Sequence, residues 1–189
     1  YSRLGDLYVE KQRYQDAAGA YRAFVGRDPD NVHAPDLAMQ AIEAYTKGGF
    51  TDLVIDGKRE YAAHYDFNDP FWKGRARTDY PVVVRQLQTN LRDLATYFHA
   101  AAQKSKLQAD YSEAARWYRS YLTSFPDAPD SAATSYLLAD ALFESHQYGE
   151  AATQYQHTAY DYPQDARSAA AAYAALVAYQ KGEEGLTGQ

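Results

Sequence analysis

Histidine is the residue type best suited to acid–base catalysis or metal binding, and in this chain its copies are scattered. The five histidines are His33, His64, His99, His146 and His157. None belongs to a cluster of His, Cys, Asp and Glu with the spacing typical of a metal site. The motifs GxSxG, GxxxxGK[ST] and HExxH are also missing from the sequence. We therefore predict structural or solvated histidines, and neither an enzyme nor a catalytic residue, metal or cofactor.

The composition is that of a folded, acidic chain. Apolar residues make up 46% and charged residues 23% of its 189 residues, and the formal net charge is −6. That charge argues against nucleic acid, whose phosphates demand clustered Lys and Arg. The absence of cysteine excludes disulfides, and the longest apolar run, 169–179, is too short to span a bilayer. The first residues already follow a helical pattern, so we expect an excerpt of a longer chain.

A short sequence motif that recurs four times marks the structural elements of the chain. It consists of an aromatic residue, any residue, an acid, and a small or apolar residue. Its copies are Tyr14-Gln15-Asp16-Ala17, Phe50-Thr51-Asp52-Leu53, Tyr111-Ser112-Glu113-Ala114 and Tyr148-Gly149-Glu150-Ala151. In three copies a tyrosine follows four residues after the alanine and a proline twelve after it: Tyr21 and Pro29, Tyr118 and Pro126, Tyr155 and Pro163. Self-similarity at this period indicates stacked repeats.

The spacing of these anchors predicts pairs of helices. Ala17, Leu53, Ala114 and Ala151 are 36, 61 and 37 residues apart, and a helix–turn–helix repeat takes about 34. The acid of each copy of the motif is expected in the first turn of a second helix, where it faces the positive end of the helix dipole. We predict an all-α solenoid of antiparallel helix pairs, about four and a half repeats in one segment, 1–189. The predicted units are 1–31, 34–66, 81–127 and 130–164, a half repeat 166–181, and an insert at 66–80.

The repeated pattern resembles the tetratricopeptide repeat (TPR). Leu4-Gly5-x-x-Tyr8, Ala17, Tyr21 and Pro29 fit that family almost fully, and small residues recur where helices must touch closely. The copy at Leu53 is degenerate, because Gly57 stands where the ring should be. A long helix from Pro81 to about Lys106 also departs from the pattern. The resemblance implies a superhelix whose concave groove is lined by the first helix of each pair.

The family's groove positions imply a set of partner-binding residues in this chain. They are Asp6, Glu10, Glu43, Lys47, His99, Gln103, Tyr136, Asp140, Phe143 and Glu144. Asp6, Glu43 and Asp140 are equivalent, so an acidic row is expected along the groove. One interpretation is a cleft for a peptide that carries Lys or Arg. The other is an ordinary solvated face, because exposed helix positions are polar in any case.

The insert contains a basic and aromatic cluster on an otherwise acidic chain. Its residues are Phe71, Trp72, Arg75 and Arg77, with Lys73 between them. Such residue types are enriched in interface hot spots, which makes the cluster a candidate secondary interface. The alternative is that both rings fold back over the gap left by the degenerate repeat.

Two joints, 125–132 and 162–169, resemble those of bacterial cell-envelope TPR scaffolds, such as the lipoprotein of the outer-membrane assembly machine and the Tol-Pal coordinator. The resemblance implies a non-enzymatic protein-binding scaffold in the periplasm, with the cytoplasm as the alternative. Two other functions stay open: a structural spacer or oligomerisation arm with self-association through the end helices, and a helical linker attached to an enzyme domain.

Overall fold

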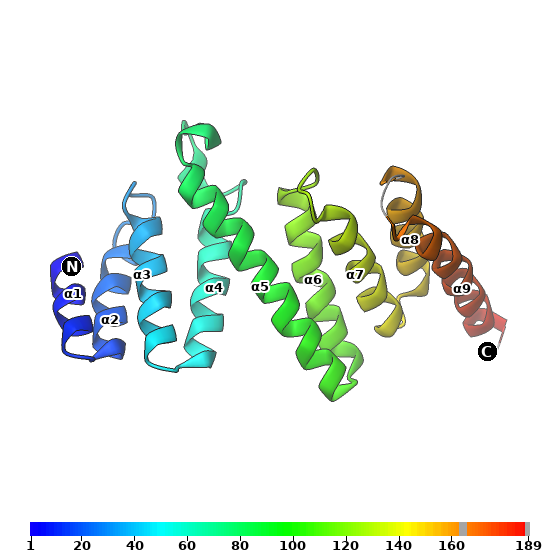
Figure 1. The fold of residues 1–189 in the computed structure, drawn as a ribbon, viewed down its shortest axis with the longest axis horizontal. Helices are drawn as coiled ribbons and strands as arrows, with labels where there is room; N and C mark the ends of the chain where they lie inside the picture. Colours follow the sequence, from blue (N-terminus) through cyan, green and yellow to red (C-terminus); the bar gives the residue numbers. More distant parts are fainter. Residues whose placement is uncertain (163–165, 188–189) are drawn as a thin grey trace. The chain divides into compact units, whose positions relative to one another are not determined.

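The computed structural model describes residues 1–162 and 166–187, and its regular structure there is entirely helical. The helices are α1 (Ser2–Glu10), α2 (Tyr14–Val25), α3 (Ala34–Lys47), α4 (Thr51–Tyr65), α5 (Pro81–Ser105), α6 (Gln108–Ser124), α7 (Ser131–Glu144), α8 (Tyr148–Asp161) and α9 (Ser168–Thr187). Two short 3-10 turns, η1 (Pro70–Trp72) and η2 (Arg77–Asp79), lie between α4 and α5. The predicted all-α fold of paired helices is confirmed (Figure 1).

The chain divides into two compact units. Unit 1 comprises Tyr1–Asn90 and unit 2 comprises Leu91–Gln189, so the long helix α5 contributes residues to both. In unit 1, α1 packs on α2, α2 on α3, and α3 on α4; in unit 2, α6 packs on α7, α7 on α8, and α8 on α9. Within α1–α4 and within α6–α9, each helix therefore contacts the next along the chain. That the whole chain is one continuous stack of repeats stays a prediction.

The turn that joins the two helices of a pair has the same backbone geometry in four places. One residue with positive φ stands two positions before the second helix begins: Gln12 (56°), Gly49 (74°), Lys106 (58°) and His146 (61°). Only Gly49 adopts this conformation without a steric cost. The common geometry makes Asp6, Glu43 and Asp140 structurally equivalent, since each lies eight residues before the second helix of its pair.

The predicted anchors lie where helices meet. Ala17, Ala114 and Ala151 are fully buried. A Cβ on Gly5 would approach the ring of Tyr21 to 2.2 Å, so only glycine lets this ring cross α1. In the degenerate pair the sizes are reversed: Ile42 occupies the first helix, and a Cβ on Gly57 would lie 2.8 Å from it. The missing ring is thus replaced by a large residue on the opposite helix.

Three sequence expectations about helix ends need comment. Glu113 was expected in the first turn of its helix, but α6 begins earlier, at Gln108, and Glu113 instead accepts hydrogen bonds from Arg116 and Trp117. The last helix continues to Thr187, beyond the predicted end at 181. Pro163, the proline that follows the last copy of the recurring motif, lies outside the described residues. The long helix from Pro81 is confirmed.

The insert 66–80 packs back onto unit 1. Phe71 is fully buried and Trp72 is 8% exposed; the indole N–H of Trp72 donates to the backbone oxygen of Tyr65 over 3.0 Å. Arg75 donates to the backbone oxygens of Phe71 and Asp30, and the Arg77 guanidinium lies 3.8 Å above the Phe67 ring. This geometry matches the interpretation in which both rings fold back onto the helices. Among Phe71, Trp72, Arg75 and Arg77, only Arg77 is largely exposed.

Candidate binding groove

The predicted groove residues of unit 1 gather around one open cavity of about 330 Å³. Asp6, Val9 and Glu10 come from α1, Tyr21 rises from α2 beneath them, and α3 supplies the opposite wall. The full lining, hereafter the acidic groove, is Asp6, Val9, Glu10, Tyr21, Gln40, Glu43, Ala44 and Lys47. The structure thus brings together all four of the groove residues that the sequence placed on α1 and α3.

Helical periodicity explains why these side chains share one wall. Asp6 and Glu10 are four residues apart on α1, and Glu43 and Lys47 are four apart on α3, so each pair lies on one side of its helix. The two acidic positions, Asp6 and Glu43, are equivalent in their helix pairs and face the same depression from either side. Three carboxylates and one ammonium give the groove a negative charge.

Tyr21 forms the floor and fixes one carboxylate. Its hydroxyl donates to Asp6 Oδ1 over 2.7 Å. Burial raises the pKa of Tyr21, and the hydrogen bond to Asp6 and the charge of Glu43 raise it further. The hydroxyl therefore stays protonated at any physiological pH and acts as a donor.

Other polar atoms of the groove lack a partner among the described residues. The side-chain oxygen of Gln40 is buried without a hydrogen bond. The Glu10 and Glu43 side chains are exposed, and neither forms a hydrogen bond or ion pair with another described side chain. A buried acceptor without a donor is destabilising by about 1–3 kcal/mol. The groove therefore presents acceptors that a donor-rich ligand would satisfy.

Unit 2 repeats the hydroxyl–carboxylate contact. The Tyr155 hydroxyl donates to Asp140 Oδ1 over 2.5 Å, and the rings of Tyr136 and Tyr155 lie 5.5 Å apart. Burial raises the pKa of Asp140, and the hydrogen bond from Tyr155 partly opposes this. Glu144 is exposed one turn further on, and the half-buried Phe143 ring packs against Tyr148 instead.

The two residues predicted on α5 have different environments. His99 is 8% exposed, and its Nδ1 lies 2.9 Å from the Tyr118 hydroxyl, whereas Gln103 is exposed. Burial lowers the pKa of His99, although the nearby charge of Glu144 opposes this. The helix α6 begins at Gln108, about one turn before Tyr111, where the recurring motif starts. The helical hairpin of α5 and α6 is therefore longer than the others, and Tyr118 faces His99. The ring of His99 is therefore buried between helices rather than exposed to a partner.

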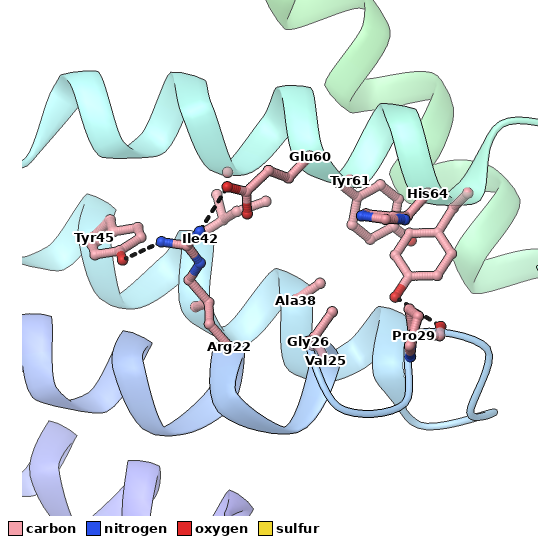
Figure 2. A pocket seen from close by; sticks show the side chains of 13 residues that line it. Arg22, Val25, Gly26, Pro29, Ala38, Ile42, Tyr45, Glu60, Tyr61 and His64 are labelled. Atoms are coloured by element: carbon pink, nitrogen blue, oxygen red, sulfur yellow. Dashed lines mark hydrogen bonds and ion pairs between the residues drawn. The ribbon is translucent and has the colours of Figure 1, made fainter.

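A second cavity in unit 1 was not predicted from the sequence. It measures about 210 Å³ and lies between α2, α3 and α4, with Ile42 and Ala38 of α3 at its base (Figure 2). We call it the tyrosine cavity; its lining is Arg22, Val25, Gly26, Pro29, Ala38, Ala41, Ile42, Tyr45, Gly57, Glu60, Tyr61, His64 and Tyr65. The sequence signal for this cavity was Gly57, because it stands where the repeat pattern expects an aromatic ring. The sequence did not show that the space left by this ring would lie next to α2.

The two cavities open on opposite sides of α3. Residues 38, 41, 42 and 45 line the tyrosine cavity, and residues 40, 43, 44 and 47 line the acidic groove. At 3.6 residues per turn these two sets point in opposite directions from the helix axis. A ligand in one cavity is therefore separated from a ligand in the other by the body of α3.

In the described part of the chain, metal-binding clusters and membrane-spanning helices are both absent. No group of three or more His, Cys, Asp and Glu side chains there is placed to hold a metal ion. No helix there is long and apolar enough to cross a bilayer.

Comparison with known proteins gives a likeness in structure alone. No protein-family model and no curated protein sequence matches the chain. Among solved structures, it is similar to a Podosopora anserina putative kinesin light chain with nearly identical TPR-like repeats. The two are 15% identical with a TM-score of 0.47, over 97% of this chain and 85% of that chain.

Proposed function

We propose that this chain is a non-enzymatic protein-binding module, and that the acidic groove of unit 1 holds a partner segment carrying Lys or Arg. The observation that supports this most directly is the set of carboxylates facing one depression: Asp6, Glu10 and Glu43 all line it. Ammonium and guanidinium groups carry only donors, so they complement this set.

Magnitudes decide what the charges contribute. An ion pair with an exposed carboxylate is worth under about 1 kcal/mol, so the acids alone do not hold a partner. Affinity would come mainly from apolar contact with Val9, Tyr21 and Ala44. The acidic residues would instead speed encounter and select cationic segments.

Fluorescence anisotropy with labelled peptides tests this proposal. A peptide with alternating Lys or Arg and apolar residues should bind, and its affinity should fall as salt rises from about 0.05 to 0.5 M, because screening shortens the range of the groove's field. Glu43→Gln should weaken binding by up to about fivefold. The control Asp52→Asn removes the same charge from an exposed position on α4 outside the groove. Salt-independent binding, or equal losses in both variants, would contradict the proposal.

We assign the module to the bacterial envelope, on the support of the joint sequences 125–132 and 162–169 alone. Osmotic-shock fractionation of a bacterial host that makes the full-length protein tests the compartment. Release with periplasmic markers is expected; retention with cytoplasmic markers would contradict it.

A structural role is the second candidate function, and exposed apolar side chains at both ends of the chain favour it. Leu4 and Leu7 on α1 are 47% and 49% exposed, and Tyr173 and Leu176 on α9 are 70% and 67% exposed. Such faces are typical of helices that pack on further repeats or subunits. Sedimentation velocity over a range of concentrations separates the candidates: self-association that Leu176→Lys abolishes would favour the structural role.

A further inference from the structure

We propose that the tyrosine cavity is a binding site for one uncharged aromatic ring. This site is independent of the proposed peptide-binding function, because it opens on the other side of α3. The cavity, of about 210 Å³, is an open concavity with a mostly apolar lining, which is the form that small-molecule sites take. For comparison, an apolar cavity of about 150 Å³ takes benzene.

The base and one end of the cavity are apolar or aromatic. Ile42 and Ala38 of α3 lie at the base, and the Tyr61 ring stands at one end beside His64 (Figure 2). The Tyr65 ring, which also lines the cavity, has its centroid 4.6 Å from that of Tyr61. The exposed ring at this end is that of His64, and it is the aromatic surface that a ligand can stack on. Aromatic rings prefer edge or offset contact with another ring, so a planar ligand gains more here than an aliphatic one of equal size.

The polar groups at the other end neutralise one another. Arg22 reaches from α2 to donate to the Glu60 carboxylate over 2.6 Å and to the Tyr45 hydroxyl over 3.3 Å. A cationic ligand would meet the Arg22 guanidinium, and an anionic ligand would meet the Glu60 carboxylate. The cavity therefore discriminates against net charge, whereas the acidic groove attracts positive charge.

The walls are held in place without a ligand. The Tyr61 hydroxyl donates to the side-chain oxygen of Gln86 over 2.9 Å, and the Tyr65 backbone oxygen accepts from Trp72 over 3.0 Å. Tyr61 and Tyr65 are each 1% exposed. A pre-formed pocket of this kind spends little free energy on ordering when it binds. The buried insert thus acts as a support for one wall of the site.

An NMR titration of the ¹⁵N-labelled protein with indole tests the proposal. Saturable shifts are expected at the amides of Ala38, Ile42 and Gly57, with little change at Glu43 and Asp6. Ala38→Leu extends a side chain into the cavity and should weaken indole binding more than about tenfold. The control Ala23→Leu makes the same change at an exposed position of α2. Absence of saturable shifts, or equal affinity in both variants, overturns the proposal.

Two further arms keep the test independent of whether Ala38→Leu folds. Tryptamine and indole-3-acetate, the charged relatives of indole, should both bind more weakly than indole to the unmodified protein; equal or tighter binding of either overturns the proposal. N-acetyl-tryptophanamide identifies the source of the ring. If it binds as tightly as indole, the site takes an aromatic side chain of a protein, and if only indole binds, it takes a free small molecule.

Discussion

At the scale of single residues, one tyrosine position of the repeat forms a hydrogen bond between the two helices of a pair. The tyrosine four residues after each anchor alanine meets a polar group of the preceding helix: Tyr21 meets Asp6, Tyr118 meets His99, and Tyr155 meets Asp140. The ring fills the gap between helices, and the hydroxyl supplies a hydrogen-bond partner to a partly buried polar group that would otherwise have none. These three contacts hold Asp6, His99 and Asp140 in fixed positions on the first helix of each pair.

The burial of His99 makes the stability of the protein depend on pH. Burial lowers the pKa of His99 from its ordinary 6.5, so below that pH the unfolded chain binds more protons than the folded one. Stability is therefore full above pH 6.5 and is lost as the pH falls through the window below it, by up to about 1.4 kcal/mol per pH unit. His99→Gln keeps a partner for Tyr118 but does not titrate.

Urea unfolding at several pH values between about 5 and 7.5 measures this effect. The free energy of unfolding should fall more steeply toward acid in the unmodified protein than in His99→Gln. His157→Gln is the matched control, because His157 is exposed on α8. Parallel curves for His99→Gln and the unmodified protein would show that His99 does not titrate differently in the folded state.

At the scale of helices, the packing of small residues against large ones decides where pairs touch. Gly5 and Gly19 are both helical glycines, yet a Cβ on Gly5 would meet Tyr21, and one on Gly19 would meet nothing within 4 Å. Gly19→Ala should stabilise the protein by about 0.5–1 kcal/mol through helix propensity. Gly5→Ala should destabilise it, because the Tyr21 ring must leave its place and its bond to Asp6. Thermal unfolding with opposite shifts for the two variants is the expected result, and a stabilising Gly5→Ala would contradict the assigned contact.

The sequence was sufficient where a local rule determines the outcome. The anchor alanines and the equivalence of Asp6 and Glu43 follow from spacing within a helix pair, and the start of α5 follows from the preference of proline, here Pro81, for the first turn of a helix. The choice of His99 over Gln103 did not, because it depends on α6 beginning before Tyr111. The tyrosine cavity was also out of reach, since it joins small residues of three helices, among them Gly26, Ala38 and Gly57.

At the scale of the whole molecule, the two units share one helix and otherwise have separate helix stacks. α5 contributes residues 81–90 to unit 1 and 91–105 to unit 2. In proteins whose repeats contact mainly their neighbours, stability is close to a sum of local terms. A substitution that strains α2 should then destabilise the helices next to α2 most, and its effect should decrease along the chain.

Hydrogen exchange on the full chain tests that expectation. Ala17→Leu overpacks the fully buried contact between α1, α2 and α3 by about 1–3 kcal/mol. Amides of α1–α4 should exchange faster by about five- to 150-fold, while those of α6–α9 keep their rates. The exposed Ala23→Leu should leave both sets unchanged. The amides of α5 carry the decisive information: acceleration that stops near residue 90 means that the two units open separately, whereas equal acceleration through α9 would show that the chain unfolds as one cooperative body.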